Sequence, residues 1–174
     1  MNTDAFIYGV SETVIVVVLG TLLLFQVYRL LEKIVRSKYE IEQNNTSYGI
    51  FVGVVLLAVS YLIVGIQTPI LTTIRLLNTE VEETIINTIS RTFGYSILYL
   101  TVLIIAIAFV LIISVKLYDF MTKRVDEFTE IKNNNMSISI ILSAVVLSIS
   151  ILTKNSIYLI IESLVPYPEI TTFF

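Results

Sequence analysis

Four long apolar stretches dominate the hydrophobic pattern of the chain, and short polar segments separate them. A transmembrane helix needs about 20 mostly apolar residues, because about 30 Å of hydrocarbon is crossed at about 1.5 Å per residue. Stretches of this kind cover residues 10–31, 47–67, 93–117 and 136–153. The pattern predicts an all-α integral membrane protein with four transmembrane helices.

The polar segments after the first and third apolar stretches resemble each other. Residues 39–50 read YEIEQNNTSYGI, and residues 129–140 read TEIKNNNMSISI. A shift of 90 residues also aligns identical residues outside these segments: Tyr28 with Tyr118, Lys33 with Lys123, Val35 with Val125, Val55 with Val145, Leu57 with Leu147, and Ser60 with Ser150. Apolar matches arise by chance in such segments, but a shared Glu-Ile-x-x-Asn-Asn-x-Ser does not. The sequence therefore indicates an internal duplication.

Each repeat is predicted to be a helical hairpin. The first hairpin covers residues 1–77, an outer connection covers residues 78–92, and the second hairpin covers residues 93–174 together with an outer tail. Because both hairpins enter the membrane from the same side, a pseudo-two-fold axis along the membrane normal is expected to relate them.

The distribution of Lys and Arg predicts the orientation. Eight basic residues follow the first and third stretches, and three lie on the other side: Arg29, Lys33, Arg36, Lys38, Lys116, Lys123, Arg124 and Lys132 against Arg75, Arg91 and Lys154. Since positive residues concentrate in cytoplasmic loops, both hairpin linkers are predicted to be cytoplasmic and both termini to lie outside. Lys154 is about 27 Å along a helix from Met136, so we expect its ammonium to reach the outer interface.

The duplicated hairpin, with its Glu-Ile-x-x-Asn-Asn motif before a span containing small residues, resembles the YjfL-like family of small bacterial inner-membrane proteins. The domain of that family is one of unknown function, number three hundred and fifty. The resemblance extends over both copies. It implies a four-span protein of the bacterial inner membrane and no particular activity.

The repeated motif allows two interpretations. Asn45 and Asn135 precede the second and fourth spans, where Asn is a favoured N-cap and where nearby carboxylates favour the positive helix end. Alternatively, the two helix ends could hold an anion, or the glutamates could form a cation ring in an assembly. The candidate residues for capping or for a site are Glu40, Asn44, Asn45, Ser47, Glu130, Asn134, Asn135 and Ser137.

A stripe of small residues follows each motif and predicts close helix packing. Spacings of four and eleven residues return to nearly the same helix face, and small residues let helix backbones approach closely in lipid. This predicts that the second and fourth spans pack together or against neighbouring protomers; a polar pore lining is the alternative. The stripe consists of Gly49, Gly53 and Ser60 in one span and Ser139, Ser143 and Ser150 in the other.

Amphipathic segments are predicted next to the spans. Apolar residues at helical spacing within 30–35 and 120–128 predict interfacial segments along the inner leaflet. Pro69 is expected to end or kink the second span. A further amphipathic helix is expected within residues 74–89, and its acidic residues Glu80, Glu82 and Glu83 are interpreted as a solvated face. The tail after Pro166 is interpreted as an interface anchor or docking segment.

Composition restricts the classes of function. The chain is 56% hydrophobic and 14% charged, and it contains neither Cys nor His. This excludes thiolate nucleophiles and Cys or His metal sites, and no basic patch indicates nucleic-acid binding. We expect no catalytic residues, metal or cofactor. The remaining interpretations are a non-catalytic, homo-oligomeric membrane subunit or scaffold that docks protein partners at its cytoplasmic linkers or outer segment, and an oligomeric channel for ions or small solutes.

Overall fold

The structure is a computed structural model that describes residues 3–79, 85–122 and 126–167, and these residues form helices and turns without a strand. The helical elements are α1 (Thr3–Leu31), the π-helix η1 (Glu32–Arg36), α2 (Ser37–Tyr39), α3 (Thr46–Thr79), α4 (Ile85–Thr122), α5 (Glu127–Lys132) and α6 (Met136–Glu162). The all-α fold class is confirmed.

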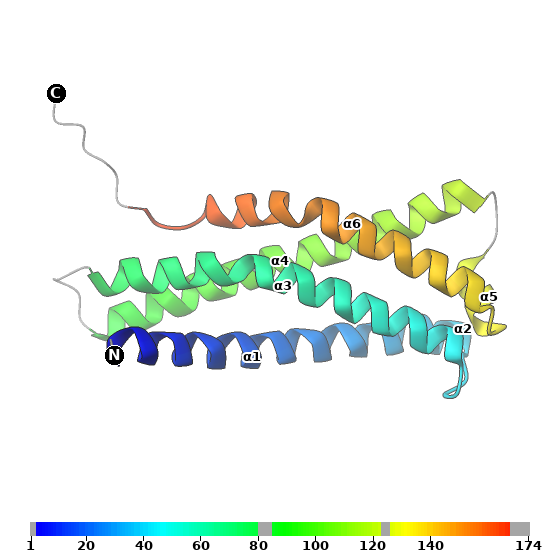
Figure 1. Ribbon diagram of the computed structural model, residues 1–174, viewed down its shortest axis with the longest axis horizontal. Coiled ribbons are helices and arrows are strands. Elements are labelled where there is room, and N and C mark those ends of the chain that lie inside the picture. The colour runs from blue at the N-terminus through cyan, green and yellow to red at the C-terminus, as the bar shows by residue number, and fades with distance from the viewer. Residues whose placement is uncertain (1–2, 80–84, 123–125, 168–174) are drawn as a thin grey trace, which may run out of the picture.

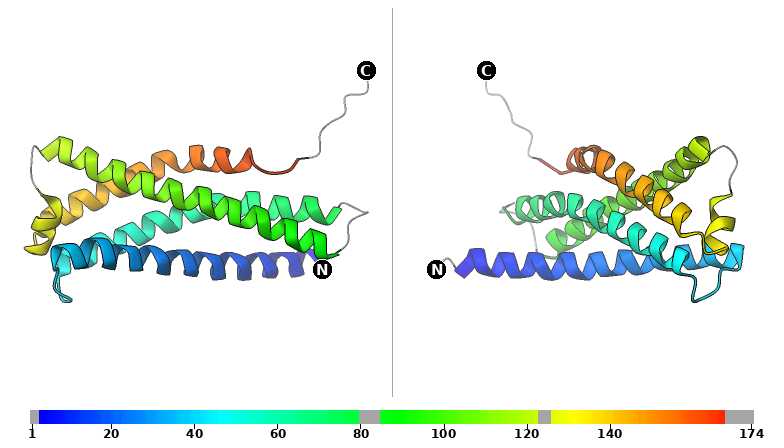
Figure 2. Two further views of the ribbon diagram at one scale, coloured as in Figure 1. Left: turned by 180° about the vertical axis from the view of Figure 1, so that it is seen from behind. Right: turned by 45° about the vertical axis from the view of Figure 1, so that its right-hand side comes forward.

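The four long helices α1, α3, α4 and α6 lie lengthwise beside one another, and the short helices α2 and α5 lie together at one end (Figure 1). Helix α3 packs against α1, α4 and α6, and α4 also packs against α6. The most extensive contact joins α3 to α6, which connects the two hairpins through their second helices (Figure 2).

Three helices are long and apolar enough to cross a membrane, judged over the described part of the chain. They cover Thr46–Leu77, Ser90–Thr122 and Met136–Glu162. Many of their large apolar side chains point outward, including Leu57, Ile105 and Leu152 with exposed fractions of 65%, 64% and 74%. Such a surface suits a lipid environment, where an exposed apolar side chain carries no penalty.

The core between α3 and α6 consists of medium-sized apolar side chains. Val55, Val59 and Leu62 of α3 and Leu142 and Val146 of α6 are at most 2% exposed. Because lipid is as apolar as these side chains, close packing rather than transfer from water must hold the pair together. Close packing in turn requires small side chains where the helix backbones approach each other.

The outer helix ends differ from their prediction. Pro69 does not end the second span, because it lies inside α3, which continues to Thr79 and is about 51 Å long. The predicted surface helix is not separate either, since its described residues belong to the ends of α3 and α4. Residues 80–84, which carry the three glutamates, and most of the predicted anchoring tail lie outside the described residues.

The two hairpin linkers also differ from each other. The first predicted interfacial segment is not a separate helix, because α1 continues without a break through η1 into α2. In this extension, Leu31 and Val35 are buried whereas Ile34 is exposed. The second linker contains the separate helix α5, whose N-cap is Asp126. Two linkers of similar sequence therefore adopt different backbone conformations.

The Lys154 side chain does not extend toward the outer end. Its aliphatic part passes Gly65, and its ammonium lies over the Tyr61 ring, 4.4 Å from the ring centroid. Helical side chains lean toward the N-terminus of their helix, so this direction leads back along α6 toward the end where α2 and α5 lie. A cation over an aromatic face is an attractive arrangement away from water.

Candidate functional site

The two copies of the repeated motif lie against each other at the α2–α5 end. Asn45 directly precedes α3, and its Oδ1 accepts a hydrogen bond of 2.7 Å from the Tyr48 backbone N–H. Its Nδ2 donates to the backbone carbonyls of Ile131 and Lys132, at 2.8 and 3.0 Å. One side chain therefore caps the start of α3 and satisfies the end of α5 in the other copy.

Ser47 makes the return contacts from the first copy to the second. Its backbone N–H donates to Asn134 Oδ1 at 2.9 Å, and its Oγ donates to the Asn135 carbonyl at 3.0 Å. The Ser139 Oγ donates to the Ser47 carbonyl at 2.5 Å. Both serines are completely buried. We call the group Asn45, Ser47, Asn134, Asn135 and Ser139 the linker clasp.

Asn135 caps α6 within the second copy. Its Oδ1 accepts a hydrogen bond of 3.5 Å from the Ile138 backbone N–H, and its Nδ2 donates to Glu130 Oε2 at 2.9 Å. Asn134 has a positive φ of 61°, a conformation that Asn tolerates better than most residues. The backbone turn that directs Asn134 at Ser47 thus requires a residue of this kind.

The other members of the motif are peripheral. Glu40 has a φ of 51° and a side chain that is 85% exposed, with Lys132 Nζ 3.7 Å from its carboxylate. Asn44 and Ser137 are exposed. Glu130 instead accepts a hydrogen bond from Asn135, so each of the two glutamates has a different partner.

The linker clasp uses its polar groups internally. Two backbone N–H groups at the start of α3 that an anion could contact, those of Ser47 and Tyr48, are already bonded to Asn134 and Asn45. No group of three or more acidic side chains suited to a metal occurs within the described ranges. The arrangement is therefore suited to holding two helix starts and one helix end at a fixed distance.

The small-residue stripe is used unequally. In α6, Ser139, Ser143 and Ser150 are at most 1% exposed. In α3, Gly49 and Gly53 are exposed, and a Cβ at either would meet no atom within 4 Å. The glycines of α3 therefore do not pack within the described protomer, whereas the serines of α6 do, and packing of the glycines against a neighbouring protomer stays a prediction.

The sequence analysis missed a buried acidic residue next to the linker clasp. Glu127, in α5, is only 4% exposed, and its Oε1 has no hydrogen-bond partner. Burial and the nearby carboxylates of Asp119, in α4, and Asp126 raise the pKa of Glu127 to about 7. Nothing in the sequence distinguishes Glu127 from its acidic neighbours, because its burial depends on how α5 packs in the folded chain.

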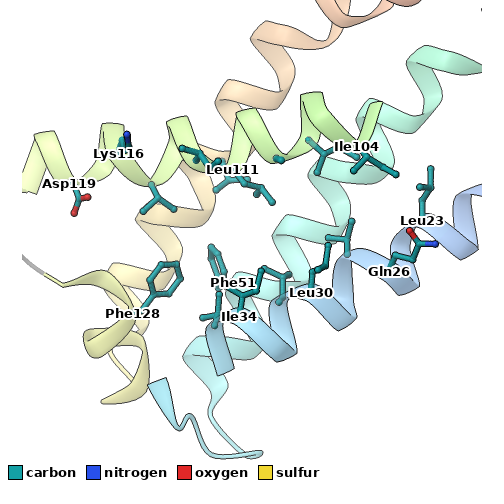
Figure 3. Close-up of a pocket in the computed structure, with 18 residues that line it drawn as sticks. Leu23, Gln26, Leu30, Ile34, Phe51, Ile104, Leu111, Lys116, Asp119 and Phe128 are labelled. Atoms are coloured by element: carbon teal, nitrogen blue, oxygen red, sulfur yellow. The ribbon is translucent and has the colours of Figure 1, made fainter. Parts of the chain in front are cut away.

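A second missed feature is an apolar cavity of about 550 Å³ between α1 and α4 (Figure 3). Phe51 of α3, Phe128 of α5 and Val146 of α6 also line it, and Lys116 and Asp119 lie at its α5 end. A hydrophobic pattern cannot show such a cavity, since lipid-facing and cavity-facing residues are equally apolar.

Comparison with known proteins gives one match. Residues 85–165 match the model of the family described as Domain of Unknown Function (DUF350). No curated protein and no solved structure matches the chain. The matched residues contain α4, α5 and α6, including the Glu-Ile-x-x-Asn-Asn motif of the second linker. The predicted resemblance is thus confirmed over residues 85–165, which match the DUF350 family and contain the second hairpin.

Proposed function

We propose that the protein is a non-catalytic integral membrane subunit or scaffold that oligomerises and docks partner proteins. The linker clasp carries this proposal. Its polar groups bond to one another across the two hairpins, and few of them are left for a substrate or an ion. A repeated motif whose two copies bond to each other supports a structural role.

The architecture of this subunit comprises four spans in two parallel hairpin repeats. Helix α1 serves as the fourth span, because its predicted stretch 10–31 is apolar and it lies lengthwise against α3. Asn45 and Asn135 occupy equivalent positions before α3 and α6, which supports the duplication. The excess of Lys and Arg at the α2–α5 end favours a cytoplasmic location for both linkers in a bacterial inner membrane, with both termini outside.

The exposed glycines of α3 provide a surface for oligomerisation. Gly49 and Gly53 lie one turn apart on a face that no other part of the described chain covers. Small residues at this spacing allow a second helix to approach closely in lipid. At the end of α4, Phe120 and Met121 are 84% and 61% exposed, and they suit the docking of a partner.

If two copies meet at this face, Gly53→Leu will prevent assembly without unfolding the protomer. The added side chain meets no atom of its own protomer but separates the helices of two copies. The oligomer mass in detergent, measured by light scattering, is expected to fall to that of a smaller species. Gly94→Leu is the matched control, since Gly94 is also exposed with open space around it. An unchanged mass for Gly53→Leu would contradict assembly through this face.

A channel is the alternative function, and the exposed Glu40 carboxylate is the observation that favours it, because copies of Glu40 could form a ring. Reconstitution into liposomes tests this alternative through K⁺, Na⁺ and Cl⁻ flux. We expect no flux above that of empty liposomes for either the wild type or the Asn45→Ala/Asn135→Ala variant. A flux in the wild type that changes in this variant would replace the scaffold with a channel.

A further inference from the structure

The apolar cavity between α1 and α4 is a groove that is open on the side of the helix bundle, between these two helices. We call it the α1–α4 groove. Its walls extend from Leu23 to Val35 on α1 and η1, and from Ile104 to Asp119 on α4. The two walls diverge toward the α5 end, where Phe51 and Phe128 lie between them (Figure 3).

The length of the groove corresponds to one leaflet of a bilayer. At helical rise its walls extend over about 18 Å on the α1 side and about 22 Å on the α4 side. One leaflet has about 15 Å of hydrocarbon and about 5–8 Å of headgroup region. Since Ile104 lies near the middle of the span Ser90–Thr122 and Asp119 lies near its end, the groove extends from the bilayer centre to the headgroups.

The volume of the groove suits a hydrocarbon chain. It provides about 550 Å³ along a length of about 20 Å. A single extended hydrocarbon chain, about 4–5 Å thick at van der Waals contact, fits this space.

The charges at the end of the groove are complementary to those of a zwitterionic phospholipid, whose phosphate lies nearer the hydrocarbon and whose ammonium lies nearer the water. Lys116 lies one turn closer to the membrane centre than Asp119, about 4.5 Å along α4. In Figure 3 the Asp119 carboxylate lies at the α5 end of the groove, on the side of α4 that faces Phe128. The positive charge is thus nearer the hydrocarbon and the negative charge nearer the water.

We propose that the α1–α4 groove binds one acyl chain of phosphatidylethanolamine from the leaflet on the α2–α5 side. Lys116 pairs with the phosphate, and Asp119 accepts a hydrogen bond from the primary ammonium. Lipids with a choline headgroup carry the same charges but have no N–H to donate, so the groove discriminates between them through Asp119. The site does not depend on the assembly proposed above.

Fluorescence quenching tests this proposal well, because the chain contains no Trp. Ile104→Trp places a probe in the groove. Ile105→Trp places a control at nearly the same depth, on a residue that is 64% exposed and does not line the groove. Each full-length variant is reconstituted in two kinds of phosphatidylcholine vesicle. One contains a fraction of phosphatidylethanolamine with brominated acyl chains, and the other contains the same fraction of phosphatidylcholine with brominated acyl chains. If Ile104→Trp fails to fold, Ile112→Trp probes the same groove.

From the quenching of the probe at residue 104, we expect the groove to bind brominated phosphatidylethanolamine about three-fold more strongly than brominated phosphatidylcholine. A difference of about three-fold in binding is what one partly exposed ion pair contributes. The control probe shows no preference, and Asp119→Asn removes the preference at the groove probe. Equal quenching by both lipids at residue 104 would overturn the proposal, because the groove would then hold unselected lipid. The proposal would also be overturned if both lipids quench the probe at residue 105 and neither lipid quenches the probe at residue 104. Protein would then cover the groove.

Discussion

Asn45→Ala is expected to lower the free energy of unfolding by about 2–3 kcal/mol and the melting temperature by about 6 °C. The substitution removes the cap of Tyr48 and the side-chain donor to the carbonyls of Ile131 and Lys132, of which the Ile131 carbonyl keeps its bond from the Asn134 backbone N–H. Loss of a cap alone costs about 1 kcal/mol, and the cross-linker hydrogen bonds contribute the rest. Thermal unfolding in detergent, followed by circular dichroism, measures this change.

Two neighbouring substitutions provide the controls. Asn44 is exposed, so Asn44→Ala is expected to change stability by less than about 0.5 kcal/mol. Asn135→Ala should cost about 1 kcal/mol, since its capping bond is long and its other bond stays within the second linker. Because Asn45 and Asn135 belong to one cluster, the double variant is not expected to show the sum of the two effects. Equal losses for Asn44→Ala and Asn45→Ala would show that the linker clasp does not hold the hairpins together.

The sequence identifies Asn45 and Asn135 as residues at helix starts, because Asn before an apolar stretch is a local signal. It does not show that the two copies bond to each other. Alignment of the repeats pairs each residue with the one 90 positions later, whereas the contacts join Asn45 to Ile131 and Ser47 to Asn134. Those contacts depend on how two hairpins dock, and that information is distributed over the whole α3–α6 interface.

The small-residue stripe shows a second limit of sequence reasoning. In an amphipathic helix of a soluble protein, the polar face is exposed, so the opposite, apolar face can be recognised as buried. A transmembrane helix is apolar on all sides, so its sequence gives no such distinction. Gly53 and Ser143 have equivalent positions in the repeat, yet Gly53 is exposed and Ser143 is buried. The rotation of each helix about its axis is set by its neighbours, so equivalent sequences can present different faces.

Glu127→Gln is expected to remove a pH dependence of stability that the wild type shows between about pH 5 and pH 8. Burial and the acidic neighbours Asp119 and Asp126 raise the pKa of Glu127 to about 7 in the folded protein, against 4.5 for an exposed glutamate. The difference corresponds to at most about 3 kcal/mol between the fully protonated and fully ionised conditions. Melting temperatures of the wild type and the variant across this pH range measure the effect.

The sign of this dependence follows from proton binding. Below about pH 4.5 both the folded and the unfolded chain carry the proton, so the stabilising contribution is complete. As the pH rises toward 7, the unfolded chain releases the proton while the folded chain keeps it, and the contribution is lost. The wild type should therefore lose stability relative to Glu127→Gln as the pH increases. Glu42→Gln, an exposed residue of the first linker, should retain the slope of the wild type. A parallel course of the wild type and Glu127→Gln would mean that the Glu127 carboxyl reaches water in the folded protein and that its pKa is not raised by burial.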